Sequence, residues 1–154
     1  MEAARRHYAR ATAIGRESQA SNVFYPGLNY LAAELALNAG RRGWKGVDHA
    51  IVEATKKSLE DKADADPDFW SVVGQAELQL YTALADGRKL AAARESLERK
   101  YSDLHERVAA SWLWASAYDT AGFVLRRYAA RATPAEAKAA AALLERLAGF
   151  ARGE

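Results

Sequence analysis

The sequence predicts an all-α protein in which about seven helices form antiparallel pairs that stack into a short α-solenoid. Three observations lead to this prediction. Helix-forming residues dominate the sequence, and β-branched residues never form the runs that are typical of strands. Glycine and proline separate the stretches that have helical periodicity. A pattern of two helices recurs along the chain with an offset of 43 residues.

Seven segments combine helix-forming composition with turn signals at their ends. They span about residues 2–17, 23–39, 46–60, 67–84, 88–100, 103–131 and 133–154. In the first segment, one apolar face is expected to carry Ala4, Tyr8, Ala11 and Ile14. In the third, the residues expected to point inward are Val47, Ala50, Ile51, Ala54 and Leu59. The connections are short, so consecutive helices are expected to be antiparallel neighbours.

Turn residues set the expected ends of the second and fourth segments. Pro26 lies in the first turn of the second segment, where a missing N–H is tolerated, and Gly40 ends that segment. The acidic stretch 61–66 is expected to be a loop. Asp66 is the expected N-cap of the fourth segment, and Pro67 takes its first position.

The fourth segment is expected to end at Asp86-Gly87, and Thr133-Pro134 with Glu136 forms a capping signature for the last. The last segment, 133–154, consists mostly of Ala, Leu, Glu, Lys and Arg, and is expected to cap the end of a solenoid. The whole chain, 1–154, is expected to be a single domain. Because Met1 is the only methionine and helical sequence begins at Glu2, we expect a piece of a longer protein.

The repeat is clearest where Ala33-Glu-Leu-Ala-Leu37 recurs as Ala76-Glu-Leu-Gln-Leu80. It pairs the second segment with the third, and the fourth with the fifth. Around the second copy, Trp70, Val73 and Gly74 have the spacing of the first helix of a tetratricopeptide repeat, which this stretch resembles. The next aromatic residue of that pattern is replaced by Glu77, and the offset exceeds the usual period of about 34. The resemblance implies elongated repeats.

A narrower resemblance covers about residues 3–130. Its motifs are Phe24-Tyr-Pro-Gly-Leu-Asn29, Asp68-Phe-Trp70 and Ser111-Trp112. These segments are similar to the tetratricopeptide-like region called the TRAFs-binding domain, which occurs in regulatory parts of stress-activated kinase cascades and in bacterial multidomain proteins. The resemblance implies a regulatory or scaffolding module without catalysis of its own.

Composition and motifs argue against several classes of function. The chain has no cysteine, which removes disulfides, thiolate metal sites and thiol nucleophiles. His7, His49 and His105 are isolated, and no nucleophile elbow or phosphate loop is found. The net charge of +2 is too small to indicate nucleic acid or membrane binding by itself. We therefore expect no catalytic residues, no metal and no cofactor, and a protein that is not an enzyme.

No apolar run approaches the roughly 20 residues that span a bilayer, and residues 1–20 lack the apolar core of a secretory signal. We therefore expect a cytoplasmic protein that does not enter a membrane.

Two groups of residues are candidates for binding a partner. Tyr25, Asn29 and Tyr30 lie near the start of the second segment, where the first helices of such pairs would line a concave groove. Arg41 and Arg42, with Lys45 beside Trp44, form a basic edge in the following turn. The alternatives are a structural hydrogen bond from Asn29 to a neighbouring loop, and a Trp44 that packs back on the helix pair while the charges are solvated.

The other tryptophans lie on the fourth and sixth segments. Trp70 is expected to fill the space between helix pairs. Trp112 and Trp114 face different sides of one helix, so one of them should lie in the core.

The function that fits these observations is a non-catalytic interaction or scaffold module. It would bind a protein, a peptide or another domain of its parent chain in a groove lined by the second, fourth and sixth helices. One alternative is nucleic-acid binding, in which the basic edge would join Arg5, Arg6, Arg10 and Arg16. Another is a helical bundle that binds a small molecule in an enclosed pocket. The sequence does not indicate the oligomeric state.

Overall fold

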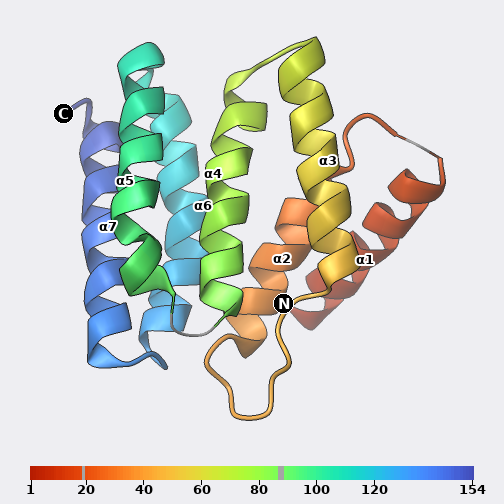
Figure 1. Cartoon of the computed structure of the whole chain (residues 1–154), viewed down its shortest axis with the longest axis horizontal. Coiled ribbons are helices and arrows are strands. Elements are labelled where there is room, and N and C mark those ends of the chain that lie inside the picture. Colours follow the sequence, from red (N-terminus) through yellow and green to blue (C-terminus); the bar gives the residue numbers. More distant parts are fainter. Residues whose placement is uncertain (19, 87–88) are drawn as a thin grey trace.

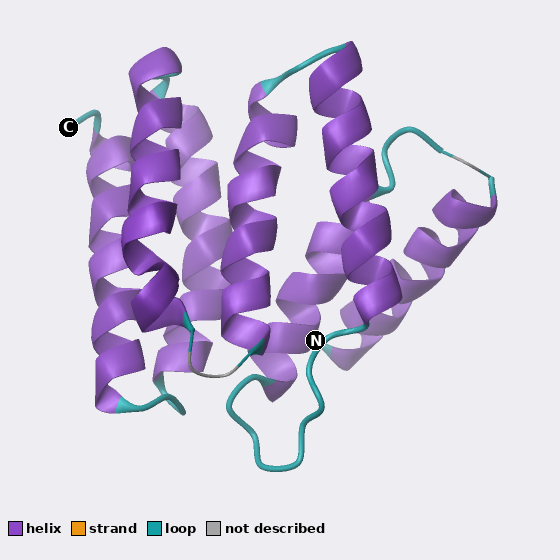
Figure 2. Cartoon of the chain, viewed as in Figure 1, coloured by secondary structure: helices purple, strands orange, loops and turns teal. Residues whose placement is uncertain are grey.

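The computed structural model describes residues 1–18, 20–86 and 89–154, and over these residues it is all-helical, with seven helices and no strand (Figures 1 and 2). The helices are α1 (Glu2–Glu17), α2 (Phe24–Asn38), α3 (His49–Ala65), α4 (Phe69–Ala85), α5 (Leu90–Arg107), α6 (Ser111–Ala129) and α7 (Pro134–Arg152). The predicted fold class, seven helices that pack against their neighbours without a sheet, is confirmed. The predicted stop at Gly87 lies outside the described residues.

The helices lie in two layers. α3, α4 and α5 are side by side in one layer, and α1, α2, α6 and α7 form the other (Figure 1). Within the predicted pairs, α2 packs on α3, α4 on α5, and α6 on α7. α6 also packs along α2, and α4 crosses over both. This arrangement brings α2, α4 and α6 together although long stretches of sequence separate them.

Two glycines allow the helices around α2 to approach closely. A Cβ atom at Gly27 of α2 would lie 2.1 Å from the Thr55 Oγ1 atom of α3, and one at Gly74 of α4 would lie 2.7 Å from a methyl carbon of Leu59. No larger side chain fits at either position without movement of the neighbouring helix. The two contacts fix the spacing of α2, α3 and α4.

The core is built around Trp114 of α6, which is fully buried, whereas Trp112 is 69% exposed. The indole of Trp114 makes edge-to-face contacts with Phe69, Tyr101 and Phe150 at centroid distances of 5.4, 6.4 and 4.9 Å. The prediction that one of these two tryptophans lies in the core is confirmed. These contacts join α4, α5 and α7 to α6.

The break between α5 and α6 lies at residues 108–110, so the predicted helix over 103–131 is wrong. Val108 has an extended backbone, and its carbonyl oxygen accepts a hydrogen bond of 2.6 Å from the Trp114 Nε1 atom. The break is therefore set by a core side chain rather than by a glycine or proline.

The predicted acidic loop at 61–66 is also wrong, because α3 continues to Ala65. Lys57 pairs with Asp61, and Lys62 with Asp66, at the i,i+4 spacing that supports a helix. The N-cap of α4 is Asp68 rather than Asp66. The predicted cap of α7 at Thr133 is confirmed, as is the stop at Gly40, where φ is +77°.

The buried faces of α1 and α3 differ in part from the predicted ones. In α1, Thr12 is buried and Tyr8 is partly buried, but Ala4 and Ile14 are exposed. The stripe that packs on α2 is therefore rotated from the expected one. In α3, Ile51 and Leu59 are buried as predicted, whereas Ala50 is exposed.

Candidate functional site

A cavity of about 540 Å³ opens between α2, α4 and α6, where the sequence predicts a groove lined by these helices. We refer to it as the α2/α4/α6 groove. Leu28 and Ala32 of α2, with Val73 of α4, give it an apolar wall, and Ser116 and Thr120 of α6 contribute hydroxyls. Its volume lies within the range of small-molecule and peptide side-chain pockets.

Four aromatic side chains line the groove: Phe24 and Tyr25 of α2, and Trp70 and Tyr81 of α4. Tyr25 is 61% exposed and Trp70 is 41% exposed, whereas Tyr81 is buried. Trp70 therefore lies at the groove between helix pairs, but it is too exposed to fill that space as expected. Phe69 takes the inner place, since its ring contacts Trp114, and Trp70 packs edge-to-face on Phe69 at 5.1 Å.

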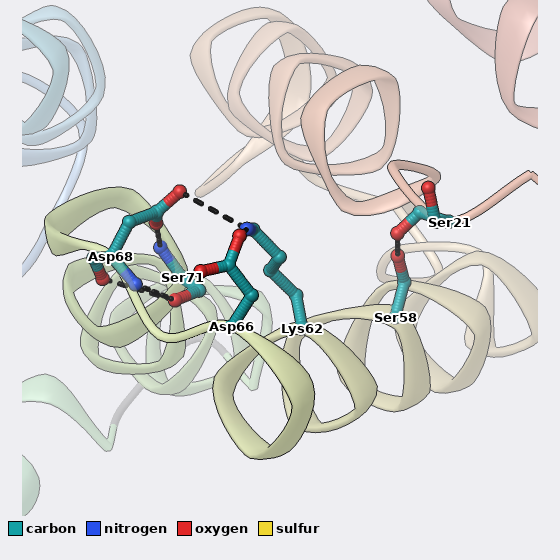
Figure 3. A network of polar contacts seen from close by, with 6 residues as sticks. All are labelled: Ser21, Ser58, Lys62, Asp66, Asp68 and Ser71. Carbon is teal, nitrogen blue, oxygen red and sulfur yellow. Dashed lines mark hydrogen bonds and ion pairs between the residues drawn. The ribbon is translucent and has the colours of Figure 1, made fainter.

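Two polar contacts hold the first residues of α2 at the groove. The Ser58 hydroxyl of α3 donates to the Ser21 carbonyl oxygen at 3.1 Å and accepts from the Phe24 N–H at 3.1 Å. Figure 3 shows Ser58 beside Ser21, on the connection between α1 and α2. A side chain of α3 thereby sets where α2 begins.

Asp68 and Ser71 form a capping box at the start of α4 (Figure 3). The Asp68 Oδ1 atom accepts from the Ser71 N–H at 2.7 Å, and the Ser71 hydroxyl accepts from the Asp68 N–H at 3.1 Å. The other carboxylate oxygen of Asp68 lies 3.7 Å from the Lys62 Nζ atom. The carboxylate of Asp68, which lines the groove, is thus already engaged.

Glu77 is the second carboxylate of the groove, and it is buried. Within the part of the chain that the structure describes, no group donates a hydrogen bond to it, and burial alone raises the pKa of Glu77 to about 7. Two buried phenols nearby, Tyr81 and Tyr101, have hydroxyls without a hydrogen-bond partner among the described residues. Burial raises the pKa of both phenols well above the usual value, and the charge of Glu77 raises it further.

Glu34 occupies the same position in the first copy of the repeated Ala-Glu-Leu segment. It too is buried, but its carboxylate is satisfied. It accepts from Arg5 Nη1 at 3.0 Å, from Trp44 Nε1 at 3.0 Å and from Asn38 Nδ2 at 2.8 Å. The two copies therefore differ in whether the chain itself supplies donors to the buried carboxylate.

Of the first group of predicted binding residues, the structure places Tyr25 and Asn29 in the groove. The Asn29 side chain donates to the Tyr25 carbonyl oxygen of its own helix at 2.8 Å, and not to a neighbouring loop as the alternative stated. Tyr30 is buried and does not line the groove. Its pKa is raised by burial and by the charge of Glu34, which places it near Glu34 rather than in the groove.

The second predicted group lies at the other end of α2. Arg41, Arg42 and Lys45 are exposed in the connection between α2 and α3. Trp44 packs back against the core and bonds to Glu34, as the alternative interpretation states. The structure does not bring this basic edge to Tyr25 and Asn29.

Glu77, Tyr81 and Phe24 line the groove but were not predicted from the sequence as site residues. The one signal in the sequence was that Glu77 stands where the repeat pattern expects an aromatic residue. A carboxylate at a position that normally packs between helices indicates either an internal partner or an external one.

A second hollow of about 730 Å³ lies between α5 and α7. Its charged side chains pair with one another, as Arg94 does with Glu98 at 3.0 Å and Arg99 with Glu95 at 3.3 Å. Arg146 is the exception among the described residues that line this hollow, because its guanidinium bonds to the Ser102 hydroxyl at 3.1 Å and lies over the Phe150 ring rather than beside a carboxylate.

No protein-family model, curated protein or solved structure matches this chain. None of the described helices has the length and apolar character needed to cross a bilayer. Over residues 1–18, 20–86 and 89–154, no three His, Asp or Glu side chains gather closely enough to hold a metal ion.

Proposed function

We propose that this chain is a non-catalytic protein-interaction module that binds a peptide segment in the α2/α4/α6 groove. The observation that carries the proposal is the combination of an apolar wall with two partly exposed aromatic side chains, Tyr25 and Trp70. Aromatic residues on a rigid helical surface are typical anchors for a peptide, because they bury a large area at a low cost in conformational entropy.

The proposal includes the repeat class. The helix pairs α2/α3 and α4/α5 carry the repeated segment, and a tetratricopeptide-like module of the TRAFs-binding-domain type would act as a regulatory or scaffolding part of a cytoplasmic protein. The partner would be another protein or a further domain of the same parent chain.

A random-peptide display library selected on the immobilised chain tests the proposal. We expect the selection to enrich a common sequence motif, and synthetic peptides with that motif to bind in solution. Tyr25→Ala and Trp70→Ala should each weaken binding at least about tenfold, as loss of an aromatic anchor does.

Trp112→Ala is the matched control, because Trp112 is exposed on α6 but does not line the groove. It should leave peptide binding unchanged. A selection without a common motif, or binding that depends on Trp112 instead of Trp70, would contradict the proposal.

Nucleic-acid binding is the second candidate, and one observation favours it. Glu34 bonds to both Arg5 and Trp44, so the first turns of α1 lie beside the connection that carries Arg41 and Arg42. A single-stranded oligonucleotide would then bind with an affinity that falls steeply with salt, and charge reversal at Arg41 and Arg42 would abolish the binding. Absence of such binding at low salt excludes this candidate.

A further inference from the structure

We propose that the α2/α4/α6 groove selects an arginine side chain of its peptide, with the guanidinium paired to Glu77 and enclosed by the aromatic rings. This inference rests on the proposed function and adds to it the chemistry of the ligand.

The charge of the groove indicates a cationic ligand. Its lining carries two carboxylates, Asp68 and Glu77, and no Lys, Arg or His among the described residues. Asp68 is engaged by the backbone of α4 and by Lys62, so Glu77 is the carboxylate that remains available. Glu77 is only 8% exposed and lines the groove, and no described residue forms an ion pair with it, so a cation that enters the groove can pair with its carboxylate.

In the first copy of the repeat, a cation is one of the three groups that satisfy the carboxylate at this position, beside Trp44 and Asn38. There, the Arg5 guanidinium of α1 lies 3.0 Å from Glu34. By the offset of 43 residues, the position of Arg5 corresponds to Asp48 in the second copy, an acidic residue that cannot replace it. The second copy thus has the carboxylate without the cation, and a bound peptide would supply it.

A guanidinium suits the groove better than an ammonium does. It presents five N–H donors in one plane, and two of them can bond side by side to the two Glu77 oxygens, which an ammonium cannot match. Its flat faces also stack on aromatic rings, which Phe24, Tyr25 and Trp70 provide at the groove.

The test uses a simple probe, N-acetyl-arginine methylamide, and its neutral isostere, N-acetyl-citrulline methylamide. Both are titrated into the isotopically labelled chain, and binding is followed by the backbone amide signals of Asn29, Val73 and Thr120. We expect saturable shifts with the arginine probe, and at least about tenfold weaker binding of the citrulline probe, since a charged hydrogen-bonded pair contributes about 1.5–3 kcal/mol.

Two variants and a pH series give independent readouts. Glu77→Gln should lower the affinity for the arginine probe at least about tenfold. Asp119→Asn, which removes the same charge from an exposed site on α6, should leave this affinity unchanged. Since the guanidinium requires an ionised Glu77, affinity should fall about tenfold for each pH unit below 7. Tyr81 and Tyr101 lie near Glu77, and burial raises the pKa of both phenols well above the usual value, so neither changes charge between pH 5.5 and 8. Asp68 and Tyr25 are the other ionisable side chains that line the groove.

Equal affinities for the arginine and citrulline probes would overturn the inference. So would an affinity for the arginine probe that changes neither with pH nor with Glu77→Gln. So would the absence of any shift at groove residues with the arginine probe at tens of millimolar. None of these outcomes removes the proposed function, which fails only if no peptide is selected through Tyr25 and Trp70. Selected peptides without a basic residue would leave the peptide groove in place and overturn the arginine inference alone.

Discussion

Glu77→Gln is expected to remove most of a pH-dependent loss of stability between pH 4.5 and pH 7. Burial raises the pKa of Glu77 from 4.5 to about 7. A raised pKa means that the folded chain holds the proton more tightly than the unfolded chain does. The contribution of protonated Glu77 to the free energy of unfolding is therefore complete below pH 4.5 and is lost as the pH rises through 7. At about 1.4 kcal/mol per pH unit, the loss amounts to about 3 kcal/mol.

The assay is urea unfolding followed by circular dichroism at 222 nm, repeated from pH 4 to pH 8 for both chains. Other carboxyls contribute their own pH dependence, but these contributions are common to both chains and cancel in the difference. We expect the free energy of unfolding of the Gln variant, relative to the unchanged chain, to rise by about 3 kcal/mol from pH 4 to pH 8. Asp119→Asn serves as the control and should show no such rise. A difference that stays constant with pH would refute the account of Glu77 as a buried, unpartnered acid.

Four further substitutions test the packing of the helices, each by thermal or urea unfolding. Gly27→Ala should destabilise the fold by about 1–3 kcal/mol, because the new methyl would meet the buried hydroxyl of Thr55 at 2.1 Å. Gly149→Ala in α7, where the nearest atom is a Glu154 carboxylate oxygen at 3.4 Å, should instead be neutral or stabilise by up to about 1 kcal/mol. Equal losses at the two glycines would contradict the close approach of α2 and α3. Glu136→Gln should lower the free energy of unfolding by about 1–3 kcal/mol, because this buried carboxylate accepts hydrogen bonds from the first two backbone N–H groups of α5 at 3.1 Å. An unchanged free energy of unfolding would show that these bonds contribute nothing. Trp114→Phe should cost a comparable amount, because the core loses volume and an indole hydrogen bond of 2.6 Å, and a loss below about 0.5 kcal/mol would contradict its central place in the core.

Local sequence signals helped to predict the fold class because some helix ends here have local causes. Thr133 caps α7 and Gly40 follows α2, and both positions could be read from residue type alone. The break at Val108 could not be read in this way. It depends on a hydrogen bond to Trp114, whose burial is a property of the tertiary structure.

The groove was predicted in outline, and its chemistry was not. The order of the helices indicated that α2, α4 and α6 would line it, and Tyr25 and Asn29 were placed there from the sequence. The sequence could not show that Glu77 is buried, because a glutamate in an Ala-rich helix is compatible with either a solvated face or a core position. Glu34 has the same local sequence as Glu77, but Arg5 and Trp44 donate hydrogen bonds to it. Neighbouring segments therefore decide whether a glutamate at this position has hydrogen-bond donors within the chain.

The most direct measurement is an NMR titration of the side-chain carboxyl carbon of Glu77, with and without N-acetyl-arginine methylamide. The account predicts a midpoint near pH 7 in the free chain, and a lower midpoint when the probe is bound, because the guanidinium stabilises the ionised carboxylate. A midpoint near the ordinary glutamate value of 4.5 that the probe leaves unchanged would contradict both the buried acid and its role in recognition.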